Sequence, residues 1–163
     1  MPFEPFRAAV AVYGILRDRQ RLLLIRRTGT GYRDGQLSLP AGHLDGGEDA
    51  VAGLVRELQE ELGIEADPHS CHLALLMHSA PEDADDSEYL HLYFFVDSWS
   101  GEPRITEPDK CSELRWTDDQ MLPADLVDYV GEALAAISRG DRLALHGWRS
   151  ASLDRDHSHG KGR

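Results

Sequence analysis

The chain has few cysteines, no long apolar runs and little positive charge. Its 163 residues include two cysteines, Cys71 and Cys111, with no paired spacing, so neither a disulfide framework nor a zinc site is expected. The longest apolar runs, 8–13 and 22–25, are much shorter than the about 20 residues that cross a bilayer. Residues 1–6 contain no basic leader followed by an apolar segment, so no signal peptide is expected. These absences favour a reduced, cytoplasmic protein with no membrane partner.

Negative charge dominates the composition. There are 17 Lys and Arg residues against 29 Asp and Glu residues, which gives a formal net charge of -12 at pH 7. Such a field repels phosphate, so a nucleic-acid polymer or an anionic membrane is not expected as a partner. A small phosphorylated ligand remains possible if a divalent metal stands between it and the carboxylates.

The length is typical of one domain, and the element pattern favours a mixed fold. We expect a domain over residues 1–147 and a polar, disordered tail over 148–163. Alternating and β-branched segments predict strands over 7–17, 21–27, 37–40, 71–78, 89–99 and 114–116, the first two as a hairpin. Apolar periodicity predicts helices over 48–62 and 124–139. Strands and helices mixed in this way indicate an α/β sandwich.

The helix over 48–62 has the clearest pattern. Val51, Val55, Leu58 and Leu62 recur at helical spacing and predict one apolar stripe against a core. Gly63 follows as the residue that takes a left-handed conformation and ends the helix.

Three carboxylates of the same helix predict a metal site. At about 100° per residue, Glu57, Glu60 and Glu61 fall within one arc, opposite the apolar stripe. Like charges at this spacing repel one another, and crowded oxygen ligands suit Mg²⁺ or Mn²⁺. Gly53 lies one turn before Glu57 and is expected to leave room for a metal or phosphate. A solvated acidic face, with Glu48 paired to Arg56, is the alternative, but the adjacent glycine-rich loop favours the metal site.

The segment from Gly42 to Ile64 resembles the Nudix box, G-x5-E-x7-R-E-U-x-E-E-x-G-U, where U is bulky and aliphatic. All nine specified positions match, in one fixed register. They are Gly42, Glu48, Arg56, Glu57, Leu58, Glu60, Glu61, Gly63 and Ile64. The resemblance implies an α/β/α sandwich with a mixed β-sheet, and it covers most of the chain, up to about residue 139.

The same resemblance implies roles for individual residues. Glu57, Glu60 and Glu61 resemble the family's divalent-metal ligands and catalytic carboxylates, and the carbonyl of Gly42 resembles its main-chain ligand. Glu48 and Arg56 resemble the salt-bridged pair that holds the loop to the helix, a structural role shared with Gly63. The general base varies across the family, and Glu57 is one candidate because it can orient an activated water.

A second similarity lies outside the box. The stretch 99–103, Trp-Ser-Gly-Glu-Pro, followed by Glu107, resembles MutT-type nucleoside triphosphate pyrophosphohydrolases. It implies that Glu107 is a further acidic metal ligand delivered from a loop. Arg27, at the end of the second expected strand, resembles an arginine that contacts the substrate phosphate.

Together these features predict a Mg²⁺- or Mn²⁺-dependent enzyme acting on a small nucleotide. The expected reaction hydrolyses a nucleoside triphosphate, including oxidised or modified purines, to the monophosphate and pyrophosphate. An ADP-ribose or other nucleoside-diphosphate-linked pyrophosphatase is one alternative. A non-catalytic Nudix domain that senses a nucleotide is another, although a sensor does not need all three carboxylates.

Overall fold

Strands of one mixed sheet form the centre of the molecule. The computed structural model describes residues 1–84 and 86–148. In chain order its strands are β1 (Ala9–Asp18), β2 (Arg21–Arg27), β3 (Leu37–Ser38), β4 (Ala41–His43), β5 (Glu65–Ala66), β6 (Cys71–Ser79), β7 (Tyr89–Val96), β8 (Trp99–Ser100), β9 (Cys111–Asp118) and β10 (Leu143–His146). The helices are α1 (Ala50–Leu62), the single 3-10 turn η1 (Pro68–Ser70) and α2 (Asp128–Ser138).

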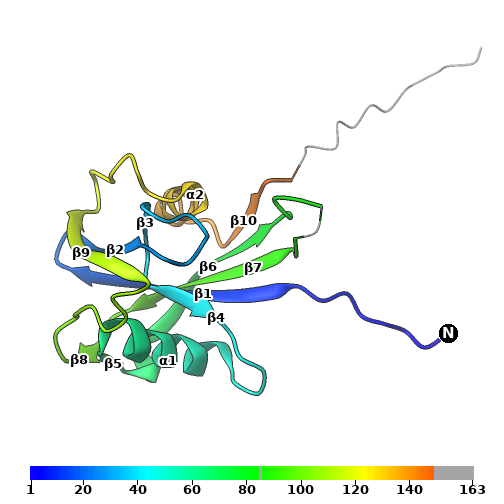
Figure 1. Cartoon of the computed structure of the whole chain (residues 1–163), viewed down its shortest axis with the longest axis horizontal. Helices are drawn as coiled ribbons and strands as arrows, with labels where there is room; N and C mark the ends of the chain where they lie inside the picture. The colour runs from blue at the N-terminus through cyan, green and yellow to red at the C-terminus, as the bar shows by residue number, and fades with distance from the viewer. Residues whose placement is uncertain (85, 149–163) are drawn as a thin grey trace, which may run out of the picture.

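The sheet has the order β10-β6-β7-β1-β2-β3, with β4 pairing to β1 and β9 pairing to β2. The β1–β7 and β6–β10 pairs are parallel and the other pairs are antiparallel, so the sheet is mixed. Helices α1 and α2 cover opposite faces of this sheet (Figure 1). The predicted α/β/α sandwich with a mixed sheet is therefore confirmed.

Each face of the sheet has its own apolar core. On the α1 side, Leu54, Leu58 and Leu62 are fully buried against side chains of β1, β2 and β7. On the α2 side, Val130 and Ala133 pack over the opposite faces of the same strands. Within the described residues, no helix is both long and apolar enough to cross a membrane.

Helix α1 begins and ends where local chemistry dictates. The carboxylate of Asp49 accepts a hydrogen bond from the backbone N–H of Ala52 (2.8 Å), so the helix starts at Ala50, two residues later than predicted. Gly63 ends it with φ 66°, as predicted. The predicted stripe faces the core: Leu58 and Leu62 are fully buried, and Val51 and Val55 are half-buried against the same cluster. Leu54, which the stripe did not include, is fully buried as well.

The remaining strands and helix α2 match their predicted bounds except where pairing with another strand or loop changes those bounds. The β1–β2 hairpin and strand β6 confirm the predictions, whereas β9 spans Cys111–Asp118 where only 114–116 was predicted. The expected strand over 89–99 divides, because residues 99–100 pair with β5 rather than with the main sheet. Helix α2 starts at Asp128 and not at 124. The residues before it pair with β3 instead: the N–H of Leu37 donates to the carbonyl of Asp125 (3.0 Å), and the N–H of Val127 donates to the carbonyl of Leu37 (2.8 Å).

Strand β10 was not predicted, and it precedes the expected tail. Trp148, the last described residue, donates from its indole Nε1 to the carbonyl of His78 (2.9 Å). The rest of the tail predicted over 148–163 lies outside the described residues.

Candidate functional site

The carboxylates of α1 divide into two that face β4 and one that faces solvent. A Cβ placed on Gly42 would lie 1.9 Å from the Glu57 carboxyl carbon, so the Glu57 carboxylate lies directly against the bare backbone of β4. Burial raises the pKa of Glu57, and the nearby charges of Glu60 and Glu107 add to this rise. Glycine is therefore required at residue 42 to admit the carboxylate.

Glu61 lies one helical turn further along and contacts the same short strand. Its Oε2 accepts a hydrogen bond from the backbone N–H of Ala41 (3.0 Å). Burial raises the pKa of Glu61 to about 8, and the charges of Glu57 and Glu107 also raise it. The expectation that all three carboxylates lie opposite the core is thus wrong for Glu57 and Glu61, because β4 closes over that side of the helix.

Glu60 remains exposed and is bonded to an arginine of its own helix. Arg56 donates from Nη1 to Glu60 (3.3 Å) and to Glu57 (2.9 Å). The same guanidinium donates from Nη2 and Nε to both oxygens of Glu48 (2.6 and 3.0 Å). Arg56 is thus the centre of a carboxylate cluster.

Glu48 links the glycine-rich loop to α1. Besides the two bonds from Arg56, it accepts one from the backbone N–H of Asp45 (2.7 Å). These hydrogen bonds, those from Arg56 above all, lower the pKa of Glu48 to about 2. The contacts fit the loop-holding role that we assign to the Glu48–Arg56 pair.

Gly53 does not provide the opening that its spacing predicts. A Cβ at this position would lie 2.3 Å from Leu44 Cδ2 and 3.0 Å from Glu48 Oε1. The bare backbone is therefore filled by the loop before α1, and this glycine is a packing residue rather than an entry for a ligand.

Glu107 reaches the cluster because the chain before it binds to the end of α1. The backbone N–H of Arg104 donates to the carbonyl of Leu62 (3.0 Å). Thr106 donates from its N–H to the backbone carbonyl of Glu61 (3.3 Å) and from its hydroxyl to the backbone carbonyl of Glu60. Glu107 itself accepts from Lys110 Nζ (2.8 Å). Sequence reasoning missed these contacts and Lys110, since no local signal marks them.

Arg27 ends β2 on the same side of the molecule. Its Nε donates to the carbonyl of Tyr32 (2.9 Å), and its Nη2 donates to the hydroxyl of Thr30 (3.2 Å). Its positive charge lowers the pKa of Glu61, against the larger rise that burial causes.

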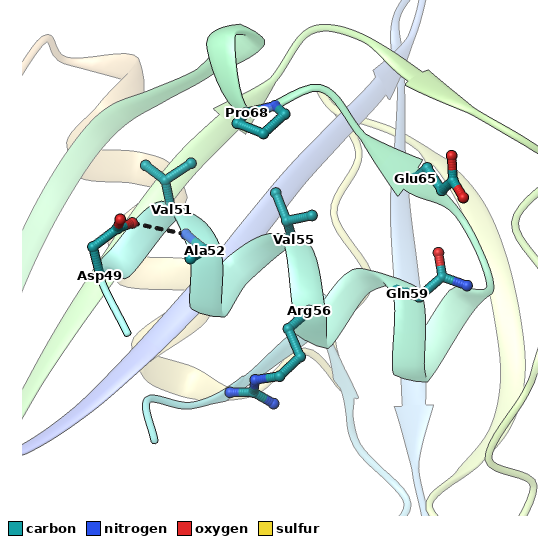
Figure 2. Close-up of a pocket in the computed structure, with 8 residues that line it drawn as sticks. All are labelled: Asp49, Val51, Ala52, Val55, Arg56, Gln59, Glu65 and Pro68. Carbon is teal, nitrogen blue, oxygen red and sulfur yellow. Dashed lines mark hydrogen bonds between the residues drawn. The ribbon is translucent and has the colours of Figure 1, made fainter. Parts of the chain in front are cut away.

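A separate hollow of about 530 Å³ lies on a different side of α1. Figure 2 shows its lining residues, among which Val51, Val55 and Pro68 are apolar. None of the three candidate carboxylates lines it. Arg56 lines the hollow, which therefore adjoins the carboxylate cluster through this residue and contains none of the candidate ligands.

The donor set fits a divalent cation, although the side chains are now bonded elsewhere. Among residues 1–84 and 86–148, no three His, Cys, Asp or Glu side chains are grouped closely enough to hold a metal ion as they stand. In this arrangement Arg56 donates to Glu57 and Glu60, and Ala41 donates to Glu61. The candidate ligands are all hard oxygens, and the burial of Glu57 and Glu61 together with the repulsion among the carboxylates favours a cation among them.

Comparisons with known proteins agree with this site. A model of the NUDIX domain matches residues 5–136. An ADP-ribose pyrophosphatase of Methanocaldococcus jannaschii is 30% identical over 121 residues, which cover 74% of this chain and 68% of that protein. An 8-oxo-dGTP diphosphatase of Escherichia coli is 32% identical over 95 residues, covering 58% and 69% respectively. The crystal structure of a MutT NUDIX hydrolase from Burkholderia pseudomallei aligns with a TM-score of 0.72 at 28% identity, covering 80% of this chain and 98% of that one.

The chain therefore belongs to the Nudix family, and it is similar to members of the MutT type, such as the Burkholderia pseudomallei hydrolase and the Escherichia coli 8-oxo-dGTP diphosphatase. It is a Nudix hydrolase, and its activity is that of a pyrophosphohydrolase. Enzymes of this family act on small nucleotide substrates and generally use divalent metals.

Replacing Glu48 by Gln tests the loop-holding role. We expect a loss of activity of about tenfold, because one charge-assisted bond to Arg56 weakens while the ligand set is unchanged. Hydrogen exchange of residues 43–48 should increase, which mass spectrometry would detect. Glu65→Gln, which removes an exposed charge from β5, is the matched control and should change neither quantity. A greater loss of activity in Glu48→Gln than in Glu61→Gln would contradict the structural role.

Proposed function

We propose that this enzyme hydrolyses a nucleoside triphosphate to the nucleoside monophosphate and pyrophosphate, using Mg²⁺ or Mn²⁺. The observation that carries the proposal is the buried pair of carboxylates, Glu57 and Glu61, held against Gly42 and Ala41 of β4. Buried carboxylates that repel one another are stabilised as anions when a cation lies between them. This argument supports a metal-dependent reaction and leaves the substrate to be argued separately.

The ligands of the cation in this proposal are the three helix carboxylates Glu57, Glu60 and Glu61, the carbonyl of Gly42, and Glu107. A bound divalent cation neutralises phosphate charge and acidifies water at its site. Glu57 and Glu60 must first release Arg56, which retains its two bonds to Glu48. Glu57 is then one candidate for the residue that orients the attacking water.

The proposed reaction breaks one phosphoanhydride bond. The oxygen of water bonds to the α- or the β-phosphorus of the triphosphate, and its proton passes to a base of the site. The bridging oxygen between these two phosphorus atoms leaves with the pyrophosphate in the first case and with the nucleoside monophosphate in the second. Arg27 supplies a positive charge for the phosphate chain. Because the chain has a net charge of -12, we expect poor binding of the triphosphate without a divalent cation.

Two observations favour a triphosphate of the MutT type. The stretch 99–103 followed by Glu107 resembles that branch, and an Escherichia coli relative is an 8-oxo-dGTP diphosphatase. We therefore propose a purine triphosphate as substrate, with an oxidised purine as the first derivative to test. The two buried free cysteines suit a role in the cytoplasmic nucleotide pool.

A second candidate substrate is ADP-ribose. The Methanocaldococcus jannaschii relative with this activity aligns over more of the chain than the Escherichia coli relative does. A non-catalytic sensor is less well supported, because the three helix carboxylates are all present.

A panel of nucleotides with Mg²⁺ tests the substrate. We expect a purine triphosphate or its oxidised form to exceed ADP-ribose in kcat/KM, and the products to be the monophosphate and pyrophosphate. Hydrolysis in water labelled with oxygen-18 would identify the attacked phosphorus. A tenfold advantage of ADP-ribose, about 1.4 kcal/mol in transition-state preference, would reject the triphosphate and leave the family unchanged.

A further inference from the structure

The connection between β2 and β3, residues 28–36, is a compact loop held by its own hydrogen bonds. The carboxylate of Asp34 accepts from the hydroxyl of Thr30 (2.7 Å), the N–H of Thr30 (3.1 Å) and the N–H of Gly31 (2.9 Å). The N–H of Gly35 donates back to the carbonyl of Arg27 (2.7 Å). Such a loop keeps its internal shape and is displaced as a unit.

The inner side of this loop fixes the direction of Arg27. Both hydrogen bonds of its guanidinium go to loop oxygens, the carbonyl of Tyr32 and the hydroxyl of Thr30, and it lies 5.8 Å from the centre of the Tyr32 ring. Both acceptors are neutral, so the guanidinium charge is not compensated by them and can serve a phosphate. Displacing the loop would displace the guanidinium.

The outer side of the loop is attached to a distant part of the chain. The hydroxyl of Tyr32 and Nη2 of Arg33 both donate to Oε1 of Glu82, at 2.7 and 2.8 Å, and Glu82 lies between β6 and β7. Arg33 also lies 3.6 Å from Asp128 at the start of α2. The backbone of Arg33 is left-handed (φ 53°), which is uncommon for a non-glycine residue. The contacts of the Arg33 side chain therefore help to hold this conformation.

We propose that Arg33 and Glu82 form a clasp that holds the loop 28–36 in place, and that Arg33 is thereby a positioning residue for Arg27. The proposal rests on the phosphate-binding role given to Arg27 above. With the clasp intact, the guanidinium of Arg27 is already oriented when the substrate arrives. With the clasp broken, binding of the phosphate chain must also order the loop, which weakens binding more than it slows the reaction.

Hydrogen exchange tests the clasp without any substrate. In Glu82→Ala we expect amide exchange across 28–36 to become about tenfold faster, because the loop opens more often. The matched control is Asp141→Ala, which removes the exposed ion pair between Arg139 and Asp141 (3.0 Å) elsewhere on the surface. Equal exchange in wild type and Glu82→Ala would overturn the clasp.

A mutant cycle tests the link to Arg27. With a nucleotide that wild type hydrolyses as the probe, Glu82→Ala should raise KM about fivefold with kcat changed less than about twofold. Glu82→Gln, whose amide oxygen can still accept from Tyr32 and Arg33, should raise KM less. In an Arg27→Gln background, Glu82→Ala should raise KM no further. If the rise in KM caused by Glu82→Ala were the same with and without Arg27→Gln, the positioning role of Arg33 would be overturned. If wild type hydrolysed no nucleotide, the proposed function would fail, while the exchange result would still decide the clasp.

Discussion

Glu61→Gln should lower kcat/KM on the order of 100-fold or more, because it removes a charged oxygen from the ligand set and leaves the rest of the site in place. The glutamine carbonyl can still accept the hydrogen bond that the N–H of Ala41 now donates to Glu61. Steady-state hydrolysis of the preferred nucleotide at several Mg²⁺ concentrations is the measurement. Activity equal to wild type would remove Glu61 from the proposed machinery.

The stability of the same variant provides the control for folding. Burial raises the pKa of Glu61 to about 8 in the metal-free fold, above the usual carboxyl value of 4.5. Stability from this group is therefore complete below the unfolded pKa and is lost as pH rises through about 8. At about pH 9 and without metal, Glu61→Gln should be more stable than wild type by at least about 1 kcal/mol, and the difference should vanish near pH 4. A variant less stable at both pH values would show that the lost activity reflects misfolding.

Gly42→Ala should cause a loss of activity of similar size for a different reason. The added Cβ would lie 1.9 Å from the carboxyl carbon of Glu57 and 2.2 Å from both of its oxygens, so the carboxylate must leave β4. Because the obstructing atoms are the far end of a flexible side chain, the free energy of unfolding should fall by no more than about 1 kcal/mol. Chemical denaturation and steady-state kinetics would separate the two effects.

Gly46→Ala is the matched control for this substitution. A Cβ at Gly46 meets nothing within 4 Å, and the residue lies in the same loop region before α1. It should retain activity within about twofold of wild type, as expected for a surface substitution away from the site. Full activity in Gly42→Ala would show that the Glu57 carboxylate does not act from its place against β4.

The sequence predicted the composition of the candidate site better than its surroundings. The box residues from Gly42 to Gly63 are adjacent along one loop and helix, so spacing alone identifies them. The backbone N–H of Ala41 could not be found in this way, because its bond to Glu61 depends on how β4 pairs with β1. The position of Glu107 likewise depends on Thr106 and Arg104 binding the last turn of α1, a contact over about 45 residues that has no local signature.

The fold shows the same division between local and distant determinants. The β1–β2 hairpin and the end of α1 at Gly63 follow from turn and cap chemistry, and both were predicted. Strand β10 is a short edge strand that depends on its parallel partner β6. Its four residues were too few for an alternation of apolar and polar residues to predict a strand. The surroundings of Gly53 were also not predicted, since its spacing suggested an opening and the side chain of Leu44, from the loop before α1, fills that space.

Binding of Mn²⁺ tests the central claim most directly, because free Mn²⁺ can be followed by electron paramagnetic resonance without a substrate. Wild type and the triple variant Glu57→Gln, Glu60→Gln, Glu61→Gln would be titrated in parallel, with circular dichroism as the check that both are folded. We expect wild type to bind Mn²⁺ and the folded triple variant to lose at least about 100-fold in affinity, since three anionic oxygens are replaced by neutral amides. A folded triple variant that binds Mn²⁺ as tightly as wild type would contradict the assignment of these carboxylates as the metal site.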